Sequence, residues 1–142
     1  MLNVPLPANE AERQQALDRL ELLDTPADPY LDTLTRLAHD LFQVKTALVT
    51  LVDRDRQWFK SRQGLDVAET PRSLSYCSHA VLRDEPLIVE DSQVDERFAG
   101  TELARGTPDV RFYAGWPLHD ADGPPLGTLC LADPKPRLFG SQ

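Results

Sequence analysis

The chain has 142 residues, of which 41% are hydrophobic and 27% charged, with a formal net charge of −8 and a pI near 4.8. This length and composition predict one soluble folded domain, and the negative charge excludes the basic footprint with which proteins bind nucleic acid or anionic membranes. No apolar run reaches the roughly 20 residues of a membrane span and the N-terminus lacks a signal-peptide pattern, so we expect a cytoplasmic protein without membrane insertion.

An extended segment and two helices come first in the chain. Residues 1–8 are rich in proline and predict a flexible lead-in. Asn9 is a helix-capping residue, and the helix that it starts carries a narrow leucine seam and ends before Pro26. This seam either packs on the domain or pairs with a second copy of the chain. Asp28-Pro29 starts a second helix, whose broader apolar stripe we expect to lie flat on a sheet. The stripe consists of Leu31, Leu34, Leu37, Ala38, Leu41 and Phe42.

A first hairpin is predicted after these helices. Residues 46–52 are apolar on both alternating faces of the predicted strand, which is typical of a central strand covered on both sides. A polar turn at 53–56 leads to 57–62, which alternate less cleanly, as an outer strand does. Residues 64–72 are polar and acidic and predict a loop.

The stretch 75–91 places a phenol, a thiol and an imidazole within four residues and then enters a strand. Ser75 or Ser73 can cap a short helix, which Pro86 ends, and residues 87–89 are apolar and partly β-branched. We expect this helix to cover one face of the sheet and to enclose whatever the protein senses.

The second half predicts another hairpin. Residues 92–98 suggest a helical turn anchored by Phe98, and 101–108 suggest irregular chain. Strands are expected at 110–118 and 126–131, joined by a turn in which Gly123 takes a positive φ. Because no strand–helix–strand crossover repeats, the order of elements predicts an α+β fold. Its central antiparallel sheet has five to six strands, with the N-terminal helices on one face and short helices and loops on the other.

Several motifs in the same order resemble those of GAF domains, the sensory modules of bacterial histidine kinases and diguanylate cyclases. They are Ala38-His-Asp-Leu-Phe, Ala47-Leu-Val-Thr-Leu-Val-Asp53, Arg56-Gln-Trp-Phe-Lys60, Ser75-Tyr-Cys-Ser-His-Ala80, Val89-Glu-Asp91, Asp95-Glu-Arg-Phe98, Arg111-Phe-Tyr-Ala-Gly115 and Gly127-Thr-Leu-Cys. The resemblance implies a single GAF domain over 1–142, a small-molecule ligand of unknown identity and an output domain in a longer chain. It also implies a homodimer, formed by the first helix. Residues 134–142 would then begin a truncated C-terminal connector, unless the chain is a free-standing short form.

The candidate ligand pocket lies between the sheet and the helix that begins after Ser75. We expect its walls to be Tyr76, Cys77, Phe98, Tyr113, Thr128 and Cys130. A small, mostly buried ligand held by few polar groups would fit such a cavity and would shift the helix above it. The sequence leaves the ligand and any cofactor unknown.

A catalytic role has weaker support. Cys77 and His79 are two residues apart on a helix and point in different directions, so they do not form a nucleophile–base pair. Cys77 and Cys130 are expected as reduced, partly buried thiols, although their spacing does not exclude a disulfide. The three histidines lie on different elements, so we expect no metal site. The leading hypothesis is therefore a non-catalytic sensor. The alternatives are a redox sensor or methionine-sulfoxide-reductase-like enzyme using these two thiols, and a dimerisation module without ligand.

Overall fold

The structure is a computed structural model that describes residues 5–107, 109–121 and 123–139. Residues 1–4 of the predicted lead-in and 140–142 of the predicted connector lie outside the described residues. The elements, in chain order, are α1 (Glu10–Leu20), α2 (Pro29–Phe42), β1 (Thr46–Val52), β2 (Arg56–Gln63), β3 (Glu69–Pro71), a 3-10 helix η1 (Arg72–Leu74), α3 (Tyr76–Arg83), β4 (Leu87–Val89), α4 (Glu102–Gly106), β5 (Phe112–His119) and β6 (Pro125–Asp133).

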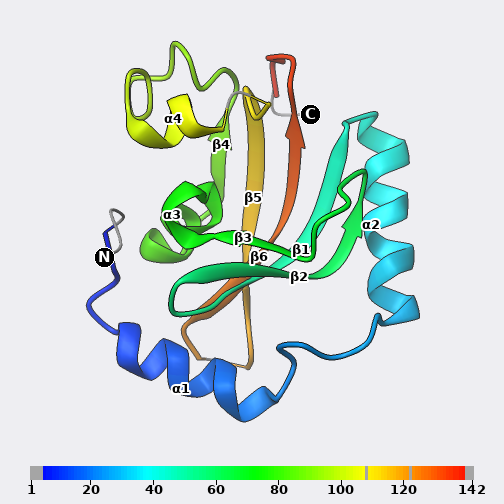
Figure 1. The fold of residues 1–142 in the computed structure, drawn as a ribbon, viewed down its shortest axis with the longest axis vertical. Helices are drawn as coiled ribbons and strands as arrows, with labels where there is room; N and C mark the ends of the chain where they lie inside the picture. The colour runs from blue at the N-terminus through cyan, green and yellow to red at the C-terminus, as the bar shows by residue number, and fades with distance from the viewer. Residues whose placement is uncertain (1–4, 108, 122, 140–142) are drawn as a thin grey trace.

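The strands form one six-stranded antiparallel sheet in the order β3-β2-β1-β6-β5-β4 (Figure 1). The two predicted hairpins are β1–β2 and β5–β6, and the pairing of β1 with β6 joins them. Every residue of β1 is buried, as expected for a central strand. The predicted α+β class and the number of strands are thus confirmed.

Side-chain alternation along the strands divides the core into two layers. Leu48 of β1 and Tyr113 of β5 pack beneath α3, whereas Ala47 and Phe112 pack on the opposite face, on the side of α2. Figure 1 shows α2 along one side of the sheet and α3 and α4 on the other. The site predicted beneath the short helix therefore belongs to the α3 face.

The leucine seam of α1 packs on the domain itself. Leu17 is fully buried against Leu51 and Trp58, and α1 crosses one end of the sheet (Figure 1). Of the two alternatives left open by the sequence, this contact selects packing on the domain. The apolar residues at the centre of the seam are therefore not free for a second copy of the chain.

The apolar stripe of α2 does not lie flat on the sheet, contrary to expectation. The helix begins as predicted, because the Asp28 carboxylate accepts hydrogen bonds from the first backbone N–H groups. Its buried residue is Thr35, whose hydroxyl lies 2.8 Å from that of Ser61 on β2. Since this polar pair sets the contact, the helix is rotated and leaves apolar side chains in solvent. Leu37 and Leu41 are 54% and 70% exposed.

Two regions expected to be irregular contain short elements. Residues 64–72 include β3, which pairs with the outer edge of β2, and 101–108 include α4, whose N-cap Thr101 accepts a hydrogen bond from the Ala104 N–H. Elements of three to five residues are too short for periodicity to reveal. In the β5–β6 turn the positive φ belongs to Ala121 rather than to Gly123. No helix among the described residues has the length and apolar character that crossing a membrane requires.

Candidate functional site

The short helix α3 forms because both of its ends are satisfied locally. The Ser75 hydroxyl accepts a hydrogen bond from the Ser78 N–H at 3.2 Å, which caps the N-terminus as predicted. At the other end Asp84 takes a left-handed conformation and its N–H bonds to the Ala80 carbonyl, two residues before Pro86. These caps fix the helix over β5 and β6 with its first turn pointing at the sheet.

The predicted site residues come together beneath α3, around the sulfur of Cys77. The Tyr113 hydroxyl donates a hydrogen bond to Cys77 Sγ at 3.1 Å, and the Thr128 hydroxyl donates one at 3.0 Å. The thiol of Cys130 lies 3.8 Å away from the same sulfur. Hydroxyl donors from β5 and β6 and the sulfur of the second cysteine therefore converge on one atom.

Aromatic rings complete this cluster. The ring of Tyr76 stacks on Tyr113 with 5.4 Å between centroids and meets Phe98 edge-on at 5.0 Å. His79 also meets Phe98 edge-on, at 5.1 Å. Each of the six predicted residues is at most 5% exposed. Their side chains therefore occupy the space beneath α3 as a packed layer.

The environment of the two thiols separates their pKa values. Burial alone would raise the pKa of Cys77, but hydrogen bonds from Cys130, Thr128 and Tyr113 outweigh burial and lower its pKa to about 7. The hydrogen bond to Cys77, followed by burial, holds the pKa of Cys130 well above its usual range. Burial and the neighbouring charge of Cys77 likewise raise the pKa of Tyr113. Cys77 is thus the sulfur that ionises first.

Two strand glycines make this packing possible. A Cβ added to Gly115 would lie 2.2 Å from the Tyr113 hydroxyl, and one added to Gly127 would lie 1.8 Å from the Thr50 carbonyl oxygen. Glycine in these two strands thus marks a close approach, of a side chain at Gly115 and of the backbone at Gly127.

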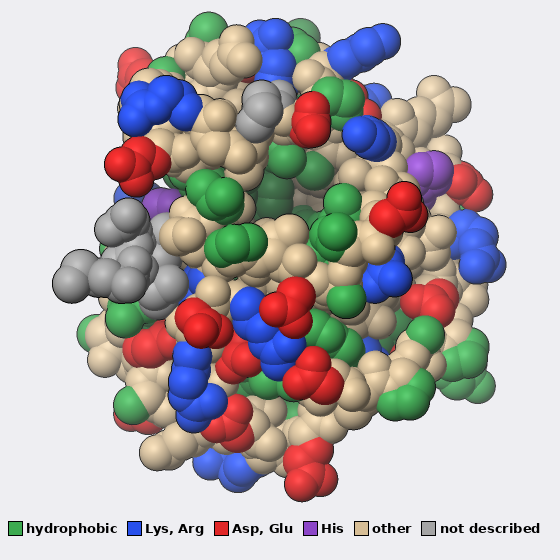
Figure 2. All heavy atoms as spheres, in the orientation of Figure 1, with side chains coloured by type: hydrophobic (Ala, Val, Ile, Leu, Met, Phe, Trp, Pro, Cys, Tyr) green, Lys and Arg blue, Asp and Glu red, His purple; other side chains and the backbone are tan. Residues whose placement is uncertain are grey.

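A cavity of about 310 Å³ opens on the same face of the sheet, beside the packed layer. Figure 2 shows the hollow near the centre of this face, with hydrophobic side chains in its walls. The lining includes Leu48, Phe59, Leu65, Leu74, Val110 and Gln57, and none of the six predicted residues is among its lining residues. The cavity and the packed layer share one hydrophobic cluster, so they are neighbours in a continuous core.

Polar groups of the cavity wall connect directly to α3. The Gln57 side-chain amide donates to the Thr70 hydroxyl at 2.6 Å, and its carbonyl oxygen accepts from the Ser75 hydroxyl at 2.7 Å. Ser75 is also the cap of α3. Sequence reasoning missed Gln57 and Thr70 as site residues. The available signal was a glutamine at the start of a strand otherwise rich in aromatic residues.

A buried ion pair links the segment before α3 to α1. Arg13 on α1 and Arg72 on η1 are both fully buried and both donate to the Glu10 carboxylate, at 2.8 and 2.7 Å. Burial alone would raise the pKa of Glu10, but the hydrogen bonds from Arg13 and Arg72 outweigh it and hold the pKa at about 2. Arg13 also donates to the carbonyl of Val52 at the end of β1. Helix α1 is thereby fixed to both β1 and η1.

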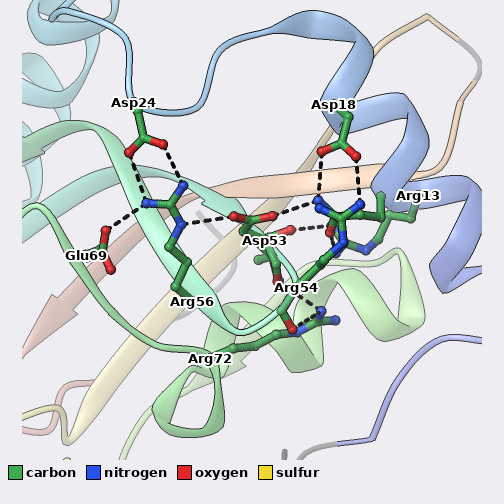
Figure 3. A network of polar contacts seen from close by, with 10 residues as sticks. Arg13, Asp18, Asp24, Asp53, Arg54, Arg56, Glu69 and Arg72 are labelled. Carbon is green, nitrogen blue, oxygen red and sulfur yellow. Dashed lines mark hydrogen bonds and ion pairs between the residues drawn. The ribbon is translucent and has the colours of Figure 1, made fainter.

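A second cluster surrounds Arg56 at the start of β2. Its guanidinium contacts the carboxylates of Asp53, Asp24 and Glu69 at 2.9, 2.9 and 2.7 Å (Figure 3). Asp24 belongs to the segment between α1 and α2, and Glu69 to β3. This basic turn is therefore neutralised by the protein's own carboxylates, which leaves little charge there for an anionic ligand.

A larger hollow, of about 660 Å³, lies at the outer edge of β4. Its apolar walls include Val94 and Leu138, which are 74% and 87% exposed, so the hollow is open to solvent. Of its charged groups, Arg97 pairs with Asp95 and Asp91 with Arg111. Glu90 accepts a hydrogen bond from the Phe139 N–H, and Arg137 donates one to the Phe42 carbonyl. We therefore take the smaller and better enclosed cavity as the candidate ligand site.

Comparison with known proteins supports a common fold. A model of the GAF domain family matches residues 26–142. A cyclic di-GMP phosphodiesterase of Pseudomonas aeruginosa is 40% identical over 137 residues, which cover 96% of this chain but only 23% of that protein.

Solved structures of low sequence identity have the same architecture. The GAF domain of an Acinetobacter phosphoenolpyruvate-protein phosphotransferase has a TM-score of 0.61 at 21% identity, over 89% of this chain and 80% of that one. The free methionine-R-sulfoxide reductase of Neisseria meningitidis, solved with its substrate, has a TM-score of 0.60 at 20% identity, over 99% and 84%. At these identities the likeness concerns the fold alone.

Proposed function

The chain belongs to the GAF domain family, and from that premise we propose that it is a non-catalytic regulatory domain that senses a small molecule. The observation that carries the proposal is the cavity of about 310 Å³ on the α3 face. Ligand pockets span about 300–1,000 Å³, so this volume suits a compact ligand of one or two rings. Leu48, Leu65 and Val110 offer apolar walls, while Gln57 and Thr70 offer hydrogen bonds. The ligand is therefore mostly apolar, with a polar atom at one edge.

The six residues predicted from the sequence form the second part of the proposed site. Tyr76, Cys77, Phe98, Tyr113, Thr128 and Cys130 are the inner layer that a ligand reaches only when α3 shifts. Such a layer lets the helix adopt two arrangements, and a ligand with different affinity for the two changes their populations.

Two contacts would transmit the ligand state. Ser75 both caps α3 and donates a hydrogen bond to the cavity residue Gln57. A ligand that forms a hydrogen bond with Gln57 would therefore compete with Ser75 and change the cap of α3. Leu74 lines the cavity two residues after Arg72, whose guanidinium is bound by Glu10 of α1. Displacement of Leu74 would thus disturb the ion pair between Arg72 and Glu10, and with it the position of α1. The cavity in this way affects both the helix above it and the N-terminal helix.

A homodimer and a fused output domain complete the proposal. The exposed residues Tyr30, Leu34, Leu37 and Leu41 recur at intervals of four, three and four on α2, the spacing of a coiled-coil seam. This supports dimerisation through α2 instead of α1, whose seam packs within the domain. The chain spans 23% of the length of its Pseudomonas relative, so a regulated catalytic domain such as a phosphodiesterase, cyclase or kinase belongs to the rest of a longer protein.

A non-catalytic role agrees with the surroundings of the thiols. A methionine-sulfoxide-reductase-like reaction needs a sulfur that a sulfoxide substrate can reach, yet Cys77 and Cys130 are each 2% exposed. His79, the nearest base in sequence, packs on Phe98. These contacts favour the sensor over the enzyme.

A thermal-shift experiment with a cavity-filling variant tests the proposal. The probes are indole, purine bases, nucleosides and aromatic amino acids. At least one should raise the Tm of the wild-type chain and of Val67→Trp, but not of Leu65→Trp. Leu65 lines the cavity, whereas Val67 is an exposed residue of the same loop and does not, so it serves as the matched control. An equal shift in all three chains, or none in the wild type, would refute the proposed site.

A further inference from the structure

The two cysteines of the chain lie side by side, although 53 positions separate them in the sequence. Helix α3 carries Cys77 and lies across β6, which carries Cys130, with 3.8 Å between the sulfurs. Disulfide sulfurs are about 2.05 Å apart, so a small approach of α3 to the sheet would suffice for bonding. We propose that Cys77 and Cys130 are a redox pair, which a hydroperoxide oxidises to a disulfide that fastens α3 to β6. This inference does not depend on a ligand in the cavity.

The hydrogen bonds identify Cys77 as the attacking sulfur. It accepts hydrogen bonds from the hydroxyls of Tyr113 at 3.1 Å and Thr128 at 3.0 Å, and its sulfur lies 3.8 Å from that of Cys130. Donors to a sulfur stabilise the thiolate, which is the nucleophilic form. Cys77 is also in the first turn of α3, where the helix dipole favours negative charge. The lowered pKa of Cys77, to about 7, agrees with this assignment.

Cys130 has the properties of a resolving thiol. Its neighbours are the Thr50 hydroxyl at 3.7 Å and the sulfur of Cys77 at 3.8 Å, with which it shares a hydrogen bond. The pKa of Cys130 is raised well above its usual range by that hydrogen bond and by burial. Cys130 therefore stays protonated while Cys77 ionises, and it is placed to attack a modified Cys77.

The reaction proceeds in two balanced steps. The Cys77 thiolate attacks one oxygen of the hydroperoxide, the O–O bond breaks, and Cys77 becomes a sulfenic acid while the other oxygen leaves as an alcohol or, from hydrogen peroxide, as water. Cys130 sulfur then attacks Cys77 sulfur, the S–O bond breaks, and the sulfenic oxygen leaves as water with the thiol proton. The two thiols together lose two electrons, and these electrons reduce one hydroperoxide molecule.

Access to the sulfurs requires a local opening of α3. The helix has only eight residues and is followed by a strand of three, so its opening would unfold a short segment and leave the central strands paired. Such short peripheral elements open at lower cost than the central strands do. Hydrogen peroxide is small enough to use a brief opening, whereas a sulfoxide substrate would need a wider one. This size limit distinguishes the proposed pair from a reductase site.

Thiol counting and intact mass on the wild-type chain provide the test. After hydrogen peroxide treatment, two thiols should fall to none in the denatured protein, and the monomer should lose the mass of two hydrogens. Peptide mapping should find Cys77 joined to Cys130, and dithiothreitol should restore both thiols. Persistence of both free thiols, stepwise oxidation to sulfinic acids, or a disulfide between chains would overturn the proposal.

Single variants test the order of the two thiols. Cys130→Ala should stop at a sulfenic acid on Cys77 that dimedone captures. Cys77→Ala should slow the loss of the remaining thiol at least tenfold. Equal rates for the two variants would contradict the assigned roles. Because the wild-type mass measurement needs no substitution, the disulfide itself remains testable even if a variant folds poorly.

Discussion

The hydroxyl of Tyr113 occupies the place where a side chain of Gly115 would begin. The distance from that hydroxyl to a Cβ built on Gly115 is 2.2 Å, and the ring carbon that bears it is at 2.7 Å. Tyr113 can donate to Cys77 because the residue two positions along the strand is a glycine. A backbone requirement in β5 is thus connected to the chemistry of a sulfur on α3.

Gly115→Ala should therefore destabilise the domain and disturb Cys77. Overpacking in a filled core costs about 1–3 kcal/mol, and the displaced phenol would no longer reach the sulfur. Urea unfolding measures the first effect. The double variant with Tyr113→Phe should recover part of the loss, because the closest clashing atom is gone. If the double variant lost as much stability as the two single variants added together, this result would contradict the proposed contact.

Ionisation of Cys77 should make stability rise with pH in the neutral range. Its folded pKa, about 7, is below the ordinary value of 9.0. A depressed pKa contributes stability that is fully present above the unfolded value and is lost as the pH falls through the folded value. The free energy of unfolding should thus increase from pH 7 to pH 9. The measurement is urea unfolding across this range, and Cys77→Ala should lack this increase.

Thr128→Val offers a separate check on the same thiol. It removes a hydroxyl donor while keeping the side-chain volume, so the pKa of Cys77 should rise. Ultraviolet absorbance of the thiolate follows this change directly. An unchanged titration curve would mean that Thr128 does not stabilise the thiolate.

Acid should weaken the attachment of α1. The pKa of Glu10 is held at about 2, compared with the ordinary 4.5, so its contribution to stability is present above pH 4.5 and is lost as the pH falls toward 2. Glu10→Gln should remove this acid dependence and, by leaving Arg13 and Arg72 buried without a carboxylate, cost about 3 kcal/mol at neutral pH. The exposed neighbour Glu12→Gln should change stability by less than about 0.5 kcal/mol. Similar losses in both variants would argue against the buried ion pair.

The exposed stripe on α2 should control association. If the domain forms a dimer through this helix, Leu37→Glu should yield monomers in analytical ultracentrifugation, because a charge would enter the seam. Gln15→Glu adds the same charge at an exposed site on α1 and should leave the dimer intact. A dimer that survives Leu37→Glu would place the interface elsewhere.

Sequence patterns were sufficient for the two hairpins of the sheet but not for its edge strand β3 or for the orientation of α2. Apolar residues on both alternating faces of 46–52 and the turns between strands predicted both hairpins, since strand periodicity is a local property. The contact between Thr35 and Ser61 depends on two distant residues, so the stripe of leucines alone suggested the wrong face. Periodicity therefore identified the helix correctly and its buried side incorrectly.

The candidate site was predictable in part for the same reason. Tyr113, Thr128 and Cys130 were expected in the walls of a site beneath the helix that follows Ser75, and the structure brings them to Cys77. The cavity depends instead on β3, η1 and α4, which are too short to show a period. Its polar wall, Gln57 with Thr70, arises only when the edge strand pairs.

Methyl NMR of the leucine and valine side chains tests the sensing claim most directly. Indole, an apolar bicyclic probe with one N–H donor, should shift the methyl signals of Leu48, Leu65, Leu74 and Val110 in a saturable manner. The methyl signals of Leu37 and Leu41 on α2 should stay unchanged. Cavity methyl signals that do not move at high indole concentration, or shifts confined to α2, would contradict the proposed ligand site.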